Sequence, residues 1–141
     1  MKTIEFDDSA WPVVKVTYSS NVDEGEFETL LDLVSGCQSR ALREGQMLAL
    51  IYDATSGYSA SARVRRRQAE WIEEHKQATK DACAGIAFVF DSVVVRGVLT
   101  AILWMSEVHA PHKVFGTLEA ASEWASLRVQ AARTQRARLG S

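Results

Sequence analysis

The chain has 141 residues, a formal net charge of −2, 47% hydrophobic residues and 24% charged residues. A chain of this size and composition is typical of one globular domain with its own core. The small negative charge argues against a general nucleic-acid binder and against a protein that adheres to acidic membranes.

The sequence carries no pattern typical of export or of membrane insertion. The segment 2–8 is polar and lacks the apolar core of a signal peptide. The longest strongly apolar run, residues 93–105, is interrupted by Arg96 and is shorter than the about 20 residues that span a bilayer. The two cysteines, Cys37 and Cys83, lack metal-ligand spacing and are expected to be free thiols. We therefore expect a cytoplasmic protein.

Hydrophobic patterns predict two strands, a helix and a third strand in the first part of the chain. Residues 4–6 are expected to form a short strand and residues 11–18 a second one. Apolar and polar side chains alternate over 14–18, which is typical of an outer strand with one solvated face. One apolar stripe at spacings of three and four predicts a helix over 22–44, with Asn21 as its N-cap. The continuous apolar run at 47–52 predicts a central strand buried on both faces.

The rest of the chain alternates helices with strands. A helix is expected over about 60–81, a buried strand at 84–90 and a nearly all-apolar helix over 93–105. A short strand at 114–115 and a closing helix from Thr117 complete the pattern.

These elements follow the order ββαβαβαβα in one domain over residues 1–134, with a frayed basic tail at 135–141. Strands that alternate with helices predict an α/β fold in which about four helices cover a mixed sheet of four or five strands. The carboxyl ends of the strands in such a sheet usually line the binding crevice. We therefore expect recognition to occur at that polar rim.

Several segments resemble the SpoIIAA-like branch of the STAS/SEC14 superfamily. They are the Asp-ended strand 48–53, the long helix through Trp71, the strand 85–89 and the closing segment 114–124. The resemblance covers roughly residues 3–127 and implies a SpoIIAA-like (STAS-like) α/β fold. For function it implies either a regulator that binds a protein partner, as STAS anti-sigma-factor antagonists do, or a binder of lipophilic ligands under a helical lid, as on the SEC14-like side.

The phosphorylation motif of the antagonists is not matched in this sequence. In that family an Asp-Ser-Ser-Gly segment lies at the N-terminus of the helix after the central strand, and phosphorylation of one serine switches a partner kinase off. The corresponding place here, Ser59–Arg63, lacks both the acid and the glycine. The segment Asp53–Gly57 has similar letters but lies too early, in the loop.

The candidate binding residues follow the third predicted strand, apart from one that lies on the helix 93–105. A helix N-terminus offers free N–H groups and a partial positive charge that can hold an anion, and nearby hydroxyls and a guanidinium add to such a site. The predicted ligand- or partner-binding residues are Asp53, Ser56, Ser59, Ser61, Arg63 and Arg96. Two alternatives stay open. Ser59 or Ser61 only caps the helix, and Arg96 reaches solvent or pairs with an internal carboxylate such as Asp53.

The predicted helix 93–105 has more apolar surface than one face of a sheet can cover. Either neighbouring helices cover the second side, or a second copy of the chain docks there and forms a homodimer. The residues of the predicted dimer contact are Val95, Leu99, Ile102, Trp104 and Met105.

No sequence pattern indicates a metal, a cofactor or a catalytic nucleophile. His109 and His112 form an isolated H-x-x-H pair, and Gly57 stands alone rather than in a phosphate-binding loop. The arginines at 63–67 are matched by the nearby Glu70, so we expect a solvated face rather than nucleic-acid binding.

We therefore predict a non-enzymatic cytoplasmic module of bacterial signalling or regulation, without metal or cofactor. It would bind a protein partner or a small anionic or lipophilic ligand. The first alternative is a lipid or other lipophilic-ligand binder that uses an apolar groove beside residues 95–105. The second is a small enzyme with acids and Arg96 at the strand ends.

Overall fold

The computed structural model describes residues 2–90 and 108–139. The predicted helix 93–105 lies outside these residues, and with it Arg96 and the whole predicted dimer contact. The homodimer and the role of Arg96 therefore stay predictions.

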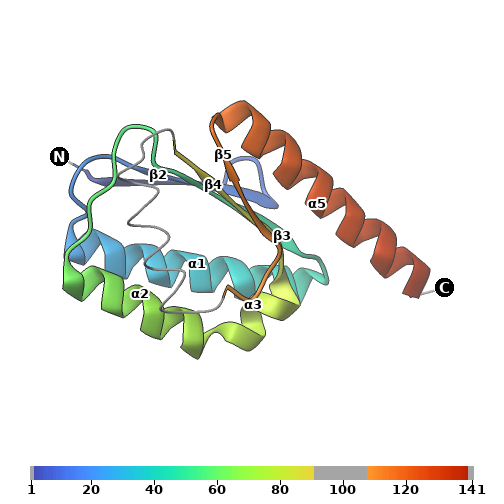
Figure 1. The fold of residues 1–141 in the computed structure, drawn as a ribbon. Coiled ribbons are helices and arrows are strands. Elements are labelled where there is room, and N and C mark those ends of the chain that lie inside the picture. The colour runs from blue at the N-terminus through green and yellow to red at the C-terminus, as the bar shows by residue number, and fades with distance from the viewer. Residues whose placement is uncertain (1, 91–107, 140–141) are drawn as a thin grey trace.

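One mixed sheet of five strands forms the centre of the described part of the chain (Figure 1). The strands lie side by side in chain order: β1 (Ile4–Asp7), β2 (Val13–Tyr18), β3 (Leu48–Asp53), β4 (Cys83–Val89) and β5 (His112–Phe115). β1 runs antiparallel to β2, whereas each later strand is parallel to its neighbour. Parallel neighbours need long crossover connections, and helices commonly provide them.

Helices cover both faces of this sheet. On one face lie α1 (Glu24–Glu44), α2 (Ala62–Glu74) and α3 (Lys76–Ala82), and on the other lies α5 (Leu118–Leu139) (Figure 1). The prediction of an α/β fold with a mixed sheet of four or five strands and about four helices is confirmed.

β2 is an internal strand, so the expectation of an outer strand is wrong. β1 pairs with the edge of β2 that faces away from β3, with Ile4 opposite Tyr18. The alternation within β2 is real, because Val14, Val16 and Tyr18 are buried while the residues between them are half-buried. A strand's own pattern shows which face is buried, but not whether another segment pairs with its edge.

Two helix boundaries also differ from the sequence prediction. α1 is capped by Asp23, whose side chain accepts a hydrogen bond from the backbone N–H of Glu26 at 2.9 Å, and not by Asn21. The long second helix is divided at His75, whose φ of −108° and ψ of 16° interrupt the α-helical path between α2 and α3. The imidazole stacks on Trp71 with 4.3 Å between ring centroids, which supports the break.

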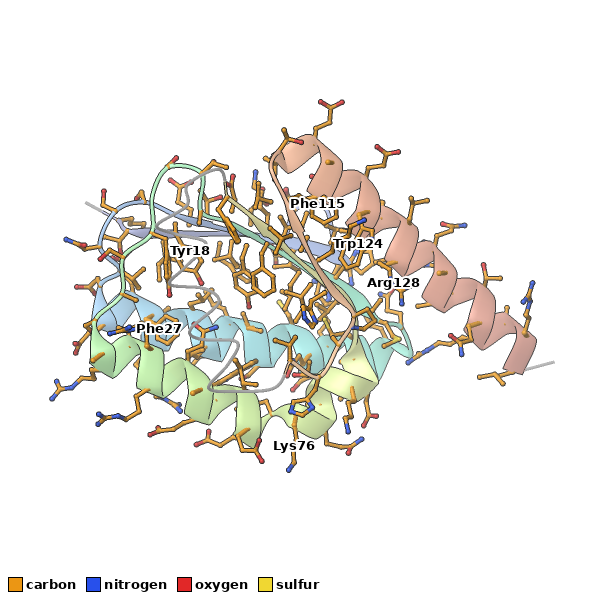
Figure 2. The ribbon with its side chains drawn as sticks, viewed as in Figure 1. Tyr18, Phe27, Lys76, Phe115, Trp124 and Arg128 are labelled. Carbon is orange, nitrogen blue, oxygen red and sulfur yellow. The ribbon has the colours of Figure 1, made fainter. Side chains whose placement is uncertain are left out.

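α5 approaches the sheet closely because small residues line the contact. Ala121 and Ala125 are fully buried against β3 and β4. Trp124 and Arg128 point from α5 towards the sheet (Figure 2). A Cβ on Gly85 of β4 would lie 2.9 Å from Trp124 Cη2, so glycine leaves the room that the indole occupies.

α5 continues to Leu139, so residues 135–139 are helical although a frayed tail is expected from the sequence. Its last buried residue is Val129. The residues after it are mainly alanine, glutamine and arginine, which are good helix formers. Backbone propensity therefore carries the helix beyond its last core contact, and the predicted domain boundary at residue 134 does not coincide with the helix end.

Candidate functional site

The predicted binding loop is held by its own turn and helix cap. Asp53 is 7% exposed, and its Oδ1 accepts hydrogen bonds from the N–H and the hydroxyl of Thr55 at 3.0 and 2.7 Å. Ser61 caps α2, because its hydroxyl oxygen accepts a hydrogen bond from the N–H of Val64 at 3.1 Å. The backbone of Ser59 bridges to the segment before α1, and Ser56 is exposed in the turn. The polar groups of Asp53 and Ser61 are thus engaged in local structure.

Acidic residues of α1 form ion pairs with two arginines of α2, Arg63 and Arg67. Arg63 Nη1 lies 3.5 Å from Glu24 Oε2, with 83% and 51% of the two side chains exposed. Ser61 donates to Glu24 Oε1 at 3.3 Å, and Arg67 Nε lies 2.9 Å from Glu28 Oε1. Exposed ion pairs contribute little to stability, but these acids occupy the place that an anionic ligand would take. The structure brings Ser61 and Arg63 together around an acid, and their role in binding stays a prediction.

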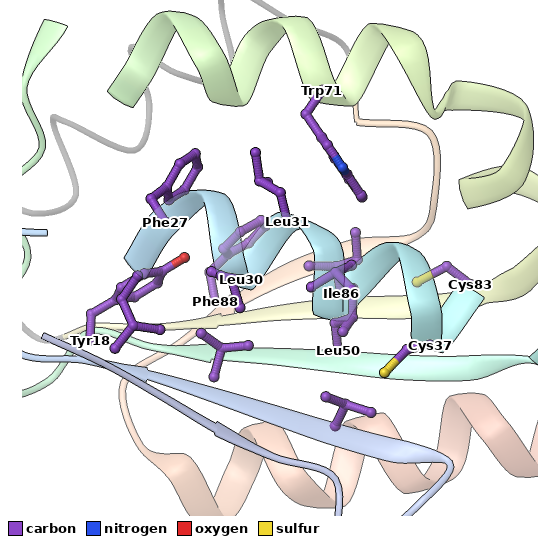
Figure 3. Close-up of a cluster of buried hydrophobic side chains, with 14 of the residues drawn as sticks. Tyr18, Phe27, Leu30, Leu31, Cys37, Leu50, Trp71, Cys83, Ile86 and Phe88 are labelled. Carbon is purple, nitrogen blue, oxygen red and sulfur yellow. The ribbon is translucent and has the colours of Figure 1, made fainter. Parts of the chain in front are cut away.

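A second candidate site lies between the sheet and the helices of the α1 face. A hollow of about 50 Å³ is bordered there by side chains from β3, β4, α1, α2 and α3. The apolar lining residues are Leu50, Tyr52, Trp71, Ile72, Ile86, Phe88 and Val108, and the polar ones are Gln38, Gln68, Thr79 and His109. Figure 3 shows Trp71 pointing from α2 towards Ile86 on β4.

Stacked rings form one wall of this region. Tyr52 lies between Tyr18 and Phe88, at centroid distances of 6.2 and 5.8 Å and interplanar angles of 13° and 16°. Tyr58 meets Tyr18 edge-on at 5.0 Å. A smaller hollow of about 20 Å³ beside Tyr18 and Tyr58 shares Tyr52, Gln68 and Phe88 with the larger one. The two hollows are therefore neighbours over a common aromatic wall.

Two residues at the larger hollow each have a buried polar atom without a hydrogen-bond partner. Gln38 is 2% exposed, and its Nε2 donates to Thr79 Oγ1 at 3.0 Å, but its Oε1 has no partner. Nε2 of His109 is also buried and unpartnered. A buried polar group without its hydrogen bond costs about 1–3 kcal/mol. A molecule that supplies the missing bond is therefore favoured at this place.

The phenol groups in the described walls of both hollows are uncharged around neutral pH. Burial raises the pKa of Tyr18 and of Tyr52 well above the usual range of a phenol. Burial also raises the pKa of Tyr58 to about 12, although the nearby Arg65 acts in the opposite direction. Within residues 2–90 and 108–139, no Asp, Glu, Lys or Arg lines either hollow. These walls suit an uncharged molecule.

The buried thiols are poor nucleophiles. Cys37 and Cys83 are free, as predicted. Burial raises the pKa of Cys83 to about 12 and raises that of Cys37, so both are protonated at neutral pH. We therefore assign no nucleophilic role to either thiol. Among the described residues, no three His, Cys, Asp or Glu side chains gather in a way that could hold a metal ion.

The sequence patterns point to the loop after β3 and miss the hollow. Gln38 offers a signal, because it is a polar residue on the otherwise apolar stripe of α1, between Cys37 and Ala41. Thr79 is likewise a buried polar residue on α3. His109 offers none, since it precedes β5 and comes near the hollow only through the tertiary fold.

This architecture, five strands with helices on both faces, is a SpoIIAA-like α/β fold, as predicted. The chain is similar to the crystal structure of an uncharacterized protein from the DUF3478 family with a SpoIIAA-like fold, from Shewanella loihica PV-4. The two share 11% sequence identity over 86% of this chain and 91% of that chain, with a TM-score of 0.60. At this identity the likeness shows the fold alone. No protein-family model and no curated protein matches the chain.

A membrane-spanning helix is not found in the described ranges, because none of their helices is both long and apolar enough to cross a bilayer.

Proposed function

We propose that this chain is a non-enzymatic binding module that holds a small, uncharged and largely apolar molecule between its sheet and α2. The observation that carries the proposal is the apolar hollow with an aromatic wall and two unpartnered buried polar atoms at its border. Ligand sites commonly combine mostly apolar walls with a few placed polar groups. The proposal keeps the small-ligand part of the sequence prediction and moves the site from the loop to the hollow.

The size of the hollow limits the ligand. One water molecule needs about 10–15 Å³ of cavity space, so a hollow of about 50 Å³ accommodates a few non-hydrogen atoms. The neighbouring hollow adds about 20 Å³. A whole acyl chain exceeds this space, which favours a small molecule over the lipid alternative.

The enzyme alternative finds less support among the described residues. The carboxylate of Asp53 is hydrogen-bonded within its own turn, and the thiol of Cys83 is protonated. A protein partner, a role in signalling, a cytoplasmic location and a homodimer remain predictions from the sequence.

The proposal is tested by ¹⁵N–¹H NMR titration of the whole chain with small neutral compounds such as 2-butanol, 2-butanone and tetrahydrofuran. We expect amide shifts concentrated at the residues that line the hollow. Ile72→Trp places an indole on the wall and should weaken binding about tenfold or more. Leu33→Trp is the matched control, because Leu33 is 41% exposed on α1 away from the hollow.

The melting temperature of each variant shows that it is folded. A folded wild-type chain in which none of these compounds shifts the amides around the hollow contradicts the proposed function. Equal loss of binding in Ile72→Trp and Leu33→Trp contradicts the placement of the site.

A further inference from the structure

We infer that the hollow selects a neutral molecule with a hydroxyl group, which Gln38 and His109 recognise by hydrogen bonds. This inference rests on the proposed binding function and names the chemical class of its ligand.

The side-chain amide of Gln38 uses its nitrogen in a hydrogen bond, whereas its oxygen has none. The residue lies on the buried stripe of α1, and its Nε2 donates to Thr79 Oγ1 of α3 at 3.0 Å. This bond restrains the plane of the amide. Its Oε1 can accept two hydrogen bonds and receives none. A buried, oriented acceptor at the border of a hollow favours a ligand that carries a hydrogen-bond donor.

His109 contributes the second polar atom, since its Nε2 is buried without a partner at the same hollow. An imidazole nitrogen donates in one tautomer and accepts in the other, so it adapts to either kind of ligand atom. A hydroxyl group donates and accepts through one oxygen, and it can therefore serve both an amide oxygen and an imidazole N–H. A ketone or an ether cannot donate to Gln38.

Charged ligands fit this site poorly. A carboxylate would face the oxygen of Gln38, and no described lining residue is Lys or Arg. An ammonium group would find no Asp or Glu among the described lining residues. An unpaired charge in an apolar site is costly. A neutral alcohol or phenol meets the polar demand without that cost.

Water competes for the same two atoms. A buried water typically makes about two to four hydrogen bonds, and most of the described wall consists of rings and aliphatic groups such as Phe88, Ile86 and Leu50. An alcohol places its hydroxyl at the polar atoms and its carbon atoms against this apolar wall. Displacing water in this way favours the alcohol.

The test compares 2-butanol with 2-butanone, which share a carbon skeleton and differ in whether the oxygen carries a hydrogen. NMR titration of the wild-type chain should give dissociation constants on the order of millimolar for such small ligands. We expect 2-butanol to bind roughly five- to tenfold more tightly, which is what one neutral hydrogen bond provides. Butyrate should bind more weakly than either.

One double variant removes the acceptor of Gln38 and keeps the shape of the hollow, and a second variant serves as its control. Gln38→Met combined with Thr79→Val removes the acceptor without leaving the threonine hydroxyl unpaired, and it should reduce the preference for the alcohol to within about twofold. Gln77→Met changes an exposed glutamine of α3 that does not line the hollow, and it should keep the wild-type preference.

The outcomes separate the inference from the proposed function. Equal binding of 2-butanol and 2-butanone, tighter binding of butyrate, or an unchanged preference in the Gln38→Met/Thr79→Val variant overturns the inference while binding itself stands. If no compound binds to a folded wild-type chain, the proposed function fails as well.

Discussion

The contact between β4 and α5 leaves no room for a side chain at Gly85, so Gly85→Ala should destabilise the fold. A Cβ at this position would lie 2.9 Å from Trp124 Cη2 and 3.0 Å from Arg128 Cγ. Non-bonded carbon atoms pack at about 3.5–4.0 Å, so α5 or its side chains must move by roughly 0.5–1 Å. Arg128 Nε also donates to the carbonyl oxygen of Ala84 at 3.0 Å, and this bond resists the movement.

The magnitude follows from two opposing terms. Overpacking of a core contact costs about 1–3 kcal/mol, whereas replacing glycine by alanine recovers about 0.4–1 kcal/mol by restricting the unfolded chain. The free energy of unfolding should therefore fall by about 1–2 kcal/mol. For a chain of this length the melting temperature should fall by about 3–7 °C. Urea and thermal unfolding followed by circular dichroism measure both quantities.

Gly36→Ala is the matched control, because Gly36 is exposed on α1 and a Cβ there meets nothing within 4 Å. This variant should gain about 0.5–1 kcal/mol through helix propensity. Trp124→Leu should relieve part of the clash, so the two changes should couple in a double-mutant cycle. A Gly85→Ala variant as stable as wild type, or a cycle without coupling, would refute the reasoning.

Three further experiments test a carboxylate, a helix cap and a buried thiol. The Thr3 hydroxyl and nearby backbone N–H groups donate to Glu26 and lower its pKa. The stability that Glu26 contributes is therefore present above its unfolded pKa and is lost as the pH falls through its folded pKa, so the difference in unfolding free energy between wild type and Glu26→Gln should shrink from about pH 5 to pH 3. Ser61→Ala removes the N-cap of α2 and should cost about 1 kcal/mol, whereas Ser56→Ala in the exposed turn should be neutral within about 0.5 kcal/mol. Thiol labelling at about pH 8 should be slow for Cys83 in the native chain and fast in urea, because burial raises its pKa to about 12.

Each of these has a clear contrary result. A Glu26→Gln difference that stays constant with pH would show that the carboxylate does not stabilise the fold through its ionised form. Equal unfolding free energies for Ser61→Ala and Ser56→Ala would show that the cap contributes nothing. Rapid labelling of native Cys83 would contradict its burial.

Local patterns predicted the elements well where burial depends on the segment itself. The continuous apolar run at 47–52 became β3 in the middle of the sheet, and the apolar stripe over 22–44 became α1. The same patterns gave wrong predictions where contacts with distant segments determine the position or the end of an element. Nothing within β2 shows that β1 covers its edge. The helix break at His75 is supported from α1, because Ser35 Oγ lies 3.2 Å from His75 Nε2.

The candidate site also has one part that local sequence predicts and one part that it does not. Ser61 could be recognised as a helix cap from its neighbours, because an N-cap bonds to an N–H a few residues away. The hollow could not be recognised, because its walls come from three helices, two strands and a loop. Gln38 and His109 belong to segments that only the fold brings to one place.

The strands of the described residues and their layered α/β architecture were thus predictable from the sequence alone, because alternation and apolar stripes depend on neighbouring residues. Only the tertiary structure decided that the side chain of Gln38 donates to Thr79, 41 positions away, and that its buried oxygen has no partner. The physical reason is that a buried polar group is satisfied or left unpaired by whatever residues pack around it, and those residues are distant in the chain.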